Sequence, residues 1–242
     1  MTGTNLLLNC WRLTNRKEDL LTEFLAATLR ADKVFSSRFA SLLLATGIQD
    51  PPGSIETQVD YPSGCPDMRL TLADGRTILV ENKLDAAETL RWSDEAEEPE
   101  PQLERYLTES VNGVAYIRAD WKPPKAEVLA HPHYLSPQDR PHYLWRDLHP
   151  LLAGCDNLLS VWLREAFEIF GFTPPLPGVG DLQDPDRAAR LVARENFAKH
   201  WDRLRARVGR MGWKSEIGDK AQLYLTAINS LAIEAVFVSP IR

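Results

Sequence analysis

The chain has 242 residues, a length that suits one domain, or one domain with an appendage. Hydrophobic residues make up 44% of it and charged residues 26%, so we expect a buried core and an ordinary soluble protein. The formal net charge is −6, so the chain as a whole is not a polycation. Any contact with nucleic acid therefore requires a locally basic surface.

Neither export nor membrane insertion is expected from the sequence. The first 13 residues have no basic leader, and no run reaches the ~18 apolar residues that a membrane-spanning helix needs. Cys10, Cys65 and Cys155 lie far apart and lack the spacing of metal ligands. This cysteine usage favours a reducing, cytoplasmic location.

The N-terminal part of the chain predicts two helices. Asn15 and Glu18 fit a capping box at the start of the first helix, which carries a leucine-rich stripe. Glu23 lies at the edge of that stripe, where it is either solvated or able to reach inward to a metal. The second helix is expected over residues 34–45, with Gly47 as its C-cap.

Three antiparallel strands are expected next. Alternating residues over 55–59 predict the first strand. Residues 68–72 and 77–83 predict a hairpin, because Asp74 and Gly75 favour a tight turn between alternating apolar residues.

The hairpin carries three charged residues that could form a site. Side chains alternate along a strand, so Glu81 and Lys83 share one face about 7 Å apart. Asp67 opens the other strand and can lie near Glu81 across the hairpin. Carboxylates in an apolar hairpin are costly unless they pair or bind a cation, and two hard oxygen ligands suit Mg²⁺. The alternative is a surface hairpin with an ordinary Glu–Lys ion pair.

An acidic stretch and a short helix follow the hairpin. Residues 85–104 contain eight acidic residues and one Arg, which usually marks a solvated loop. The stretch could instead shield a cleft against non-target nucleic acid or contact a partner. Pro101 suits the first turn of a helix on which Gln102 and Tyr106 share one face. On a purely structural interpretation, these two residues belong to the helix surface and to the edge of the core. On a functional interpretation, Gln102 orients a phosphate or a water molecule and Tyr106 packs beside it.

The rest of the core is expected to complete a mixed α/β fold. Residues 114–117 predict a buried strand parallel to the second hairpin strand, because a helix crosses over before it. An edge strand is expected over 143–145, and helices over 147–153 and 158–170. A Pro-rich boundary then ends a core domain of residues 1–175.

The tail, residues 181–242, is expected to be a separate extension. Its predicted helix runs to about residue 208, and nine Lys or Arg residues stand against two acids between 187 and 214. This charge either serves phosphate binding or belongs to a charged amphipathic helix. Residues 223–228 and 231–238 predict an apolar hairpin, which must pack on the main sheet or on a second chain and so allows a homo-oligomer.

The order and spacing of these motifs resemble the PD-(D/E)xK nuclease superfamily, in its exonuclease-like branch with a Gln-x-x-x-Tyr motif. The resemblance covers about residues 14 to 172 and departs from the family in the longer acidic insertion. The motifs that carry it are Pro66-Asp67, Glu81-Asn82-Lys83, the helix that contains Glu23, and Gln102-Leu103-Glu104-Arg105-Tyr106.

The resemblance implies a central mixed β-sheet flanked by helices, a restriction-endonuclease-like core that the tail extends. It implies a nuclease that hydrolyses phosphodiester bonds of DNA with Mg²⁺ or Mn²⁺, and a role in defence against foreign DNA would suit it. The alternative is an inactive module of the same fold that binds nucleic acid or a partner protein. The implied metal ligands are Glu23, Asp67, Glu81 and the carbonyl of Asn82, and the implied catalytic residues are Asp67, Glu81, Lys83, Gln102 and Tyr106.

Overall fold

The structure is a computed structural model, which describes residues 5–47, 50–91, 99–178, 180–183, 185–210, 214–215 and 237–238. The chain divides into two compact units, Met1–Pro174 and Pro175–Arg242, which meet inside the Pro-rich segment. The residues of the proposed site all belong to the first unit. Among the helices of the described ranges, none combines the length and the hydropathy of a membrane-spanning segment.

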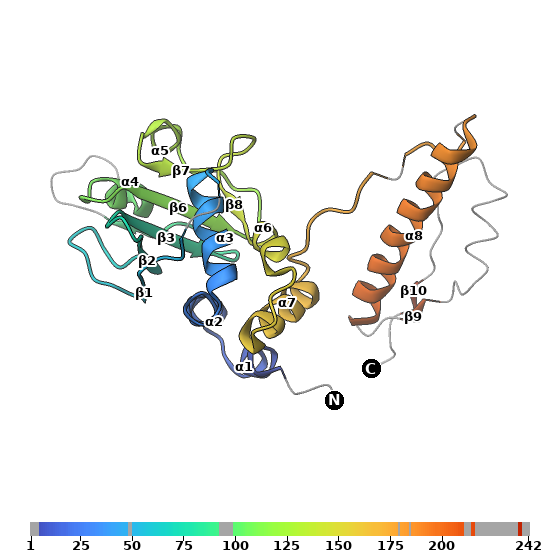
Figure 1. The fold of residues 1–242 in the computed structure, drawn as a ribbon, viewed down its shortest axis with the longest axis horizontal. Coiled ribbons are helices and arrows are strands. Elements are labelled where there is room, and N and C mark those ends of the chain that lie inside the picture. The colour runs from blue at the N-terminus through green and yellow to red at the C-terminus, as the bar shows by residue number, and fades with distance from the viewer. Residues whose placement is uncertain are drawn as a thin grey trace. The chain divides into compact units, whose positions relative to one another are not determined.

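A mixed six-stranded sheet forms the centre of the first unit (Figure 1). Its first three strands are antiparallel, and the later strands join parallel to the central one, as the expected mixed α/β class requires. The strand order is β1-β2-β3-β6-β7, with β8 also paired to β6. The strands are β1 (Ser54–Thr57), β2 (Met68–Thr71), β3 (Thr77–Lys83), β6 (Gly113–Arg118), β7 (Tyr134–Leu135) and β8 (Tyr143–Leu144).

The predicted hairpin is confirmed. Strands β2 and β3 pair antiparallel from Met68↔Val80 to Thr71↔Thr77. Gly75 takes a positive φ of 85°, which is the conformation that a glycine in a tight turn adopts without steric cost. The predicted parallel strand over 114–117 is also confirmed, because β6 pairs with β3 in parallel register.

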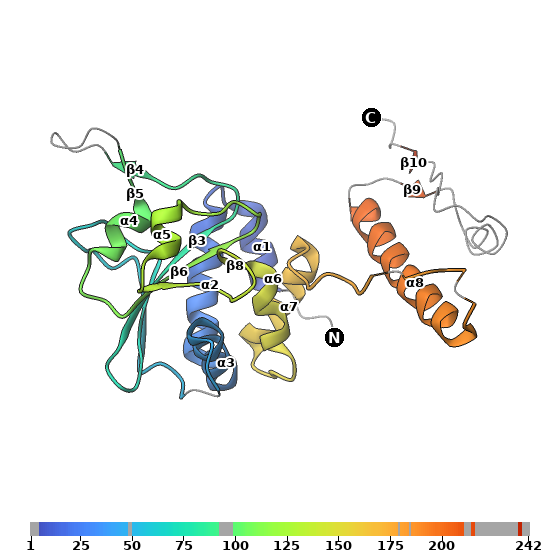
Figure 2. The same ribbon diagram turned by 90° about the horizontal axis from the view of Figure 1, so that it is seen from above.

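Helices cover both faces of this sheet (Figure 2). Ile78 and Val80 point to the face where the larger group of helices packs, and Leu79 points to the other, where Leu103 and Tyr106 pack on it. The larger group is α1 (Leu6–Leu13), α2 (Lys17–Ala31), α3 (Lys33–Leu44), α6 (Trp145–Leu148), the 3₁₀ helix His149–Leu152 and α7 (Leu158–Phe170). The opposite face carries α4 (Gln102–Leu107) and α5 (Ala126–Ala130).

Two short strands lie within the acidic stretch, one on each side of residues 92–98. β4 (Leu90–Arg91) pairs antiparallel with β5 (Glu100–Pro101), so the described ends of the stretch form a ribbon beside α4. The acidic residues between 92 and 98 lie outside the described residues. The structure therefore describes the expected solvated loop only on the two sides of residues 92–98.

The helix ends differ from the sequence expectations. The N-cap of α2 is Arg16, without a side-chain cap, so the predicted capping box is wrong. The Glu18 carboxylate has tertiary partners instead, described below. The C-cap of α3 is Ala45, with a left-handed φ of 49°, and not the predicted Gly47. The predicted edge strand also ends one residue early, because Trp145 begins α6.

The second unit is described mainly by its helix, α8 (Arg187–Arg210). Two polar side chains tie this helix to the segment before it: the Asn196 amide donates to the Gly178 carbonyl at 3.0 Å, and His200 Nε2 lies 2.8 Å from the Pro177 carbonyl. β9 (Lys214–Ser215) pairs antiparallel with β10 (Phe237–Val238). The rest of the predicted hairpin, residues 223–236, lies outside the described residues.

Trp145 joins the helical layer to the central strand. Its side chain is fully buried, and its indole Nε1 donates a hydrogen bond to the Lys83 carbonyl at 3.1 Å. The ring packs against Phe167 and Phe172 at centroid distances of 6.1 and 6.2 Å.

We expect Trp145→Phe to lower the free energy of unfolding by about 1–3 kcal/mol, because a buried carbonyl loses a donor and the smaller ring leaves a void. Urea denaturation measures this change. Trp121→Phe is the control, since that side chain is 59% exposed and should change stability by less than about 0.5 kcal/mol. Equal effects of the two substitutions would contradict the role given to Trp145.

Candidate active site

The Asp67 carboxylate lies where the hairpin ladder ends. The pairing Met68↔Val80 is the last one between the two strands, which puts Asp67 next to Glu81 and on the same face of the sheet. Asp67 Oδ2 accepts a hydrogen bond from the Asn82 backbone N–H at 2.7 Å, so the carboxylate continues the ladder. Asp67 Oδ1 accepts another from Gln58 Nε2 at 3.2 Å. Both oxygens are thus held in fixed directions in a residue that is only 7% exposed.

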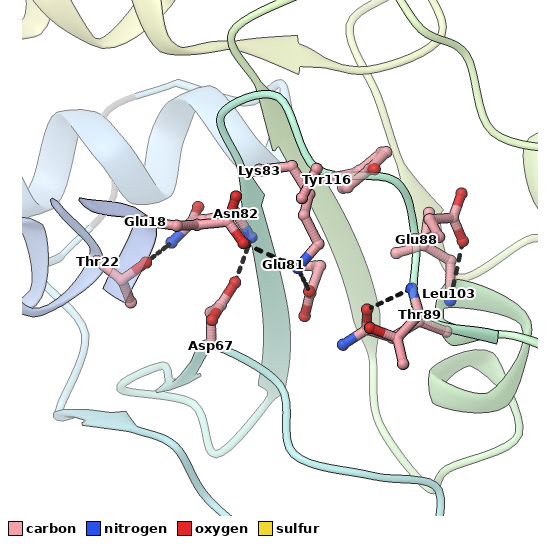
Figure 3. Close-up of polar contacts among 12 residues, drawn as sticks. Glu18, Thr22, Asp67, Glu81, Asn82, Lys83, Glu88, Thr89, Leu103 and Tyr116 are labelled. Atoms are coloured by element: carbon pink, nitrogen blue, oxygen red, sulfur yellow. Dashed lines mark hydrogen bonds and ion pairs between the residues drawn. The ribbon is translucent and has the colours of Figure 1, made fainter. Parts of the chain in front are cut away.

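Glu81 and Lys83 lie on one face of β3, and alternation along the strand makes it the face of Leu79 as well. Figure 3 shows these two charged side chains together. The Lys83 ammonium lies 2.6 Å from Glu81 Oε1, and the Glu81 side chain is only 1% exposed. Within the described part of the chain, Glu81 Oε2 is buried and has no hydrogen-bond partner. A buried carboxylate oxygen without a donor is costly, which marks it as a position for a cation or a ligand.

Helix α2 contributes a carboxylate, but it is Glu18. Glu18 Oε1 lies 3.1 Å from the Lys83 ammonium, and Glu18 Oε2 accepts from the Leu84 backbone N–H at 2.8 Å. Glu23, the residue expected to reach a metal, is exposed. The helix therefore presents Glu18 to Lys83 (Figure 3), while Glu23 is exposed to solvent.

Asn82 points its side chain to the opposite face of the strand. Its amide is fully buried and donates to Thr22 Oγ1 on α2 at 3.1 Å. A metal ligand from this residue would have to be the main-chain carbonyl, as the resemblance implies. The side chain serves instead to fasten the strand to α2.

Gln102 and Tyr106 lie on α4, against the same face as Glu81. Gln102 Nε2 donates to the Tyr106 hydroxyl at 2.7 Å, and both side chains are buried. Burial raises the pKa of Tyr106 above its usual value, and the charges of Glu81 and Asp67 raise it further. Tyr106 is therefore a neutral phenol close to the two carboxylates, and its hydroxyl fixes the direction of the Gln102 amide.

Burial and mutual repulsion change the protonation of the cluster. Burial raises the pKa of Asp67 to about 6 despite the hydrogen bond from Asn82 and the charge of Lys83. Burial and the charge of Asp67 raise the pKa of Glu81 to about 8. Burial by itself lowers the pKa of Lys83, but the charge and hydrogen bond of Glu81 outweigh it and raise this pKa above its usual value. Lys83 is therefore an ammonium at neutral pH, and burial together with the nearby Asp67 favours the protonated form of Glu81.

The donor set fits a hard divalent cation held by two carboxylates. Within the described ranges, no group of three or more His, Cys, Asp or Glu side chains is arranged to hold a metal ion. Mg²⁺ commonly uses one or two carboxylates, with waters and phosphate oxygens at its other positions. The bare Glu81 Oε2 and the repulsion between Asp67 and Glu81 are the features that such an ion would relieve.

Three residues of this cluster were not expected from the sequence. Gln58 follows β1 and holds Asp67 from a left-handed backbone conformation, with φ 52°; no sequence pattern marks it. Thr22 contacts Asn82 only through the tertiary fold. Glu18 fits a capping box in the sequence, and that local pattern gives no sign of its contact with Lys83.

Comparison of the chain with protein-family models, with curated proteins and with solved structures gives no match. The function is therefore inferred from the site itself.

Without added metal, the free energy of unfolding should fall by about 2–4 kcal/mol as pH rises from about 5 to 8 because of Glu81. The folded protein keeps the Glu81 proton up to a pKa of about 8, whereas the unfolded chain releases it near 4.5. Unfolding thus releases a proton in this window, and rising pH favours it. Glu81→Gln does not titrate, so its stability should exceed that of the wild type increasingly toward pH 8.

Urea denaturation in a chelator across this pH range measures the difference between the two proteins. Glu127→Gln, at an exposed position on α5, is the matched control and should follow the wild type. Parallel curves for wild type and Glu81→Gln would show that Glu81 ionises at its ordinary pH in the folded protein.

Proposed function

We propose that the chain is a metal-dependent nuclease of the PD-(D/E)xK type that hydrolyses phosphodiester bonds of DNA with Mg²⁺ or Mn²⁺. The observation that carries the proposal is the buried, donor-free Oε2 of Glu81, next to Asp67 and to the ammonium of Lys83. Two converging carboxylates and one fixed cation form an arrangement suited to a phosphate and an attacking water. A bound divalent ion would stabilise negative charge on the phosphate oxygens and on the leaving group.

Asp67 and Glu81 would hold this ion from the two strands of the hairpin. Glu81 must give up its proton before it can act as a ligand, so ion binding should weaken in acid. Asp67 needs no reorientation of its own, because Gln58 and the Asn82 N–H already fix both of its oxygens. The main-chain carbonyl of Asn82 is a further candidate ligand, as the family resemblance implies.

Lys83 would act as a hydrogen-bond donor. Its raised pKa keeps it protonated, so it cannot take a proton from water in this state. Held between Glu81 and Glu18, it can direct the oxygen of a water molecule and offset charge on a phosphate. The Gln102–Tyr106 pair would form the wall of the site beside the carboxylates. Such an enzyme would suit defence against foreign DNA.

We expect Asp67→Asn, Glu81→Gln and Lys83→Met each to lower cleavage by about 100-fold or more, because each removes a charge that the reaction uses. Purified protein is incubated with linear, circular and single-stranded DNA and RNA, with Mg²⁺, with Mn²⁺ or with chelator. Glu127→Gln is the matched surface control. Full activity in all three variants would refute the site assignment.

Binding of Mn²⁺ by calorimetry gives a second measurement. The wild type should bind the ion, and Asp67→Asn and Glu81→Gln should bind it much more weakly. A chain that binds Mn²⁺ but cleaves no DNA or RNA would instead be the non-catalytic module considered from the sequence.

Gln58 is a positioning residue for Asp67 under this proposal. Gln58→Ala should weaken Mn²⁺ binding by about 10-fold, because the amide that directs Asp67 Oδ1 is lost. Gln58→Gly should bind equally weakly but be more stable than Gln58→Ala by about 1 kcal/mol, because glycine takes the left-handed φ of 52° without strain. Calorimetry and urea denaturation separate the two effects.

Ala45 provides a control for backbone strain alone. It has a similar left-handed φ of 49° as the C-cap of α3, and its backbone N–H bonds to carbonyls of that helix. Ala45→Gly should stabilise the protein without changing its affinity for Mn²⁺. If Gln58→Gly binds the ion as tightly as the wild type does, the amide of Gln58 does not position Asp67.

A further inference from the structure

Trp121 is an exposed aromatic residue without an assigned role. Its side chain is 59% exposed. In the described part of the chain it is the only aromatic among the large hydrophobic side chains that are mostly exposed. A single exposed hydrophobic residue is common on protein surfaces, so its position and its neighbours decide what it can do.

Trp121 lies just beyond the C-terminal end of β6, next to the C-terminal end of β3, which carries Glu81 and Lys83 of the proposed active site. β6 runs parallel to β3, and Lys83 pairs with Arg118, the last residue of β6. The connection continues beyond the strands, because the Ala119 N–H donates to the Lys83 carbonyl at 3.1 Å. Trp121 follows Ala119 by two residues, on the segment that leaves the C-terminal end of β6.

A series of rings links Trp121 to the site. The Trp121 ring lies 5.6 Å from the His142 ring, which lies 6.0 Å from the Tyr116 ring. Tyr116 in turn is the register partner of Glu81 on the adjacent strand. His142 is fully buried, its Nε2 lies 3.0 Å from the Asp120 carbonyl, and burial lowers its pKa, so the ring is neutral near pH 7. Trp121 is therefore supported from one side, while much of its ring area stays open.

Positive charge follows Trp121 along the segment. Lys122 is exposed, and Lys125 is about half exposed beside Glu104, with an N–O distance of 3.3 Å. Two prolines, Pro123 and Pro124, separate these lysines and restrict the backbone between them. The acid nearest to Trp121 in the sequence, Asp120, is paired with Arg118 at 2.7 Å.

We propose that Trp121 is a stacking platform for an unpaired nucleobase of the substrate, with Lys122 and Lys125 facing the phosphates beside it. An aromatic face flanked by lysines is the common arrangement for binding single-stranded nucleic acid. A base inside a duplex already stacks on both sides, so Trp121 favours single strands or frayed ends. This inference rests on the proposed nuclease function and names its substrate class.

The test measures binding of metal-free, full-length protein to a fluorescein-labelled single strand of about 16 nucleotides by fluorescence anisotropy. Trp121→Ala should weaken binding by about 5- to 100-fold, because base–aromatic stacking of this strength is lost. Trp121→Phe should stay within about threefold of the wild type, since it keeps a ring. Leu129→Ala, at a side chain that is 41% exposed on α5, is the control and should not change binding.

A blunt duplex of the same length is the second ligand. Trp121→Ala should bind it as the wild type does, because no unpaired base is offered. Equal losses on duplex and single strand, or no loss on the single strand, would overturn the assignment.

The outcomes separate this inference from the proposed function. If Trp121→Ala binds single strands normally while Asp67→Asn abolishes cleavage, the platform is wrong and the nuclease stands. If the wild type neither binds nor cleaves any nucleic acid, both proposals fall.

Discussion

The ammonium of Lys83, held between Glu81 and Glu18, is the interaction on which the site depends. It lies at 2.6 Å from one carboxylate and 3.1 Å from the other, and it is largely buried. Without it, Glu81 would leave both of its oxygens without a partner in a nearly dry environment. The same contact ties α2 to the central strand, since Glu18 also accepts the Leu84 N–H. The electrostatics of the cluster and the packing of the helix are thus coupled.

The central strand, β3, makes this cluster possible because its two neighbouring strands run in opposite directions. β3 has an antiparallel neighbour on one side, which brings Asp67 back next to Glu81, and a parallel neighbour on the other, which brings Tyr116 beside it. Alternation along the strand then separates the buried Asn82, on the α2 face, from Glu81 and Lys83 on the α4 face. One strand therefore both anchors the helical layer and carries the charged residues.

Sequence reasoning was most successful where structure is decided locally. The hairpin followed from alternation and from the turn at Gly75, and the parallel β6 followed from the helix that precedes it. It was weakest where a side chain chooses between a local and a distant partner. Glu18 matched a capping box but binds Lys83, 65 residues away, and Ala45 rather than a glycine takes the left-handed cap. Gln58 could not be foreseen, because its role comes from a strained conformation next to Asp67.

The bond from the Asn82 N–H to Asp67 Oδ2 has an evolutionary consequence. The aspartate closes the end of a sheet as well as carrying charge, so its loss would leave a buried amide without an acceptor. Substitutions tolerated at residue 67 should therefore keep an acceptor, such as asparagine or serine, more often than they introduce an aliphatic side chain. Residue 67 should therefore stay polar for the sake of the sheet, independently of any chemistry at the carboxylates.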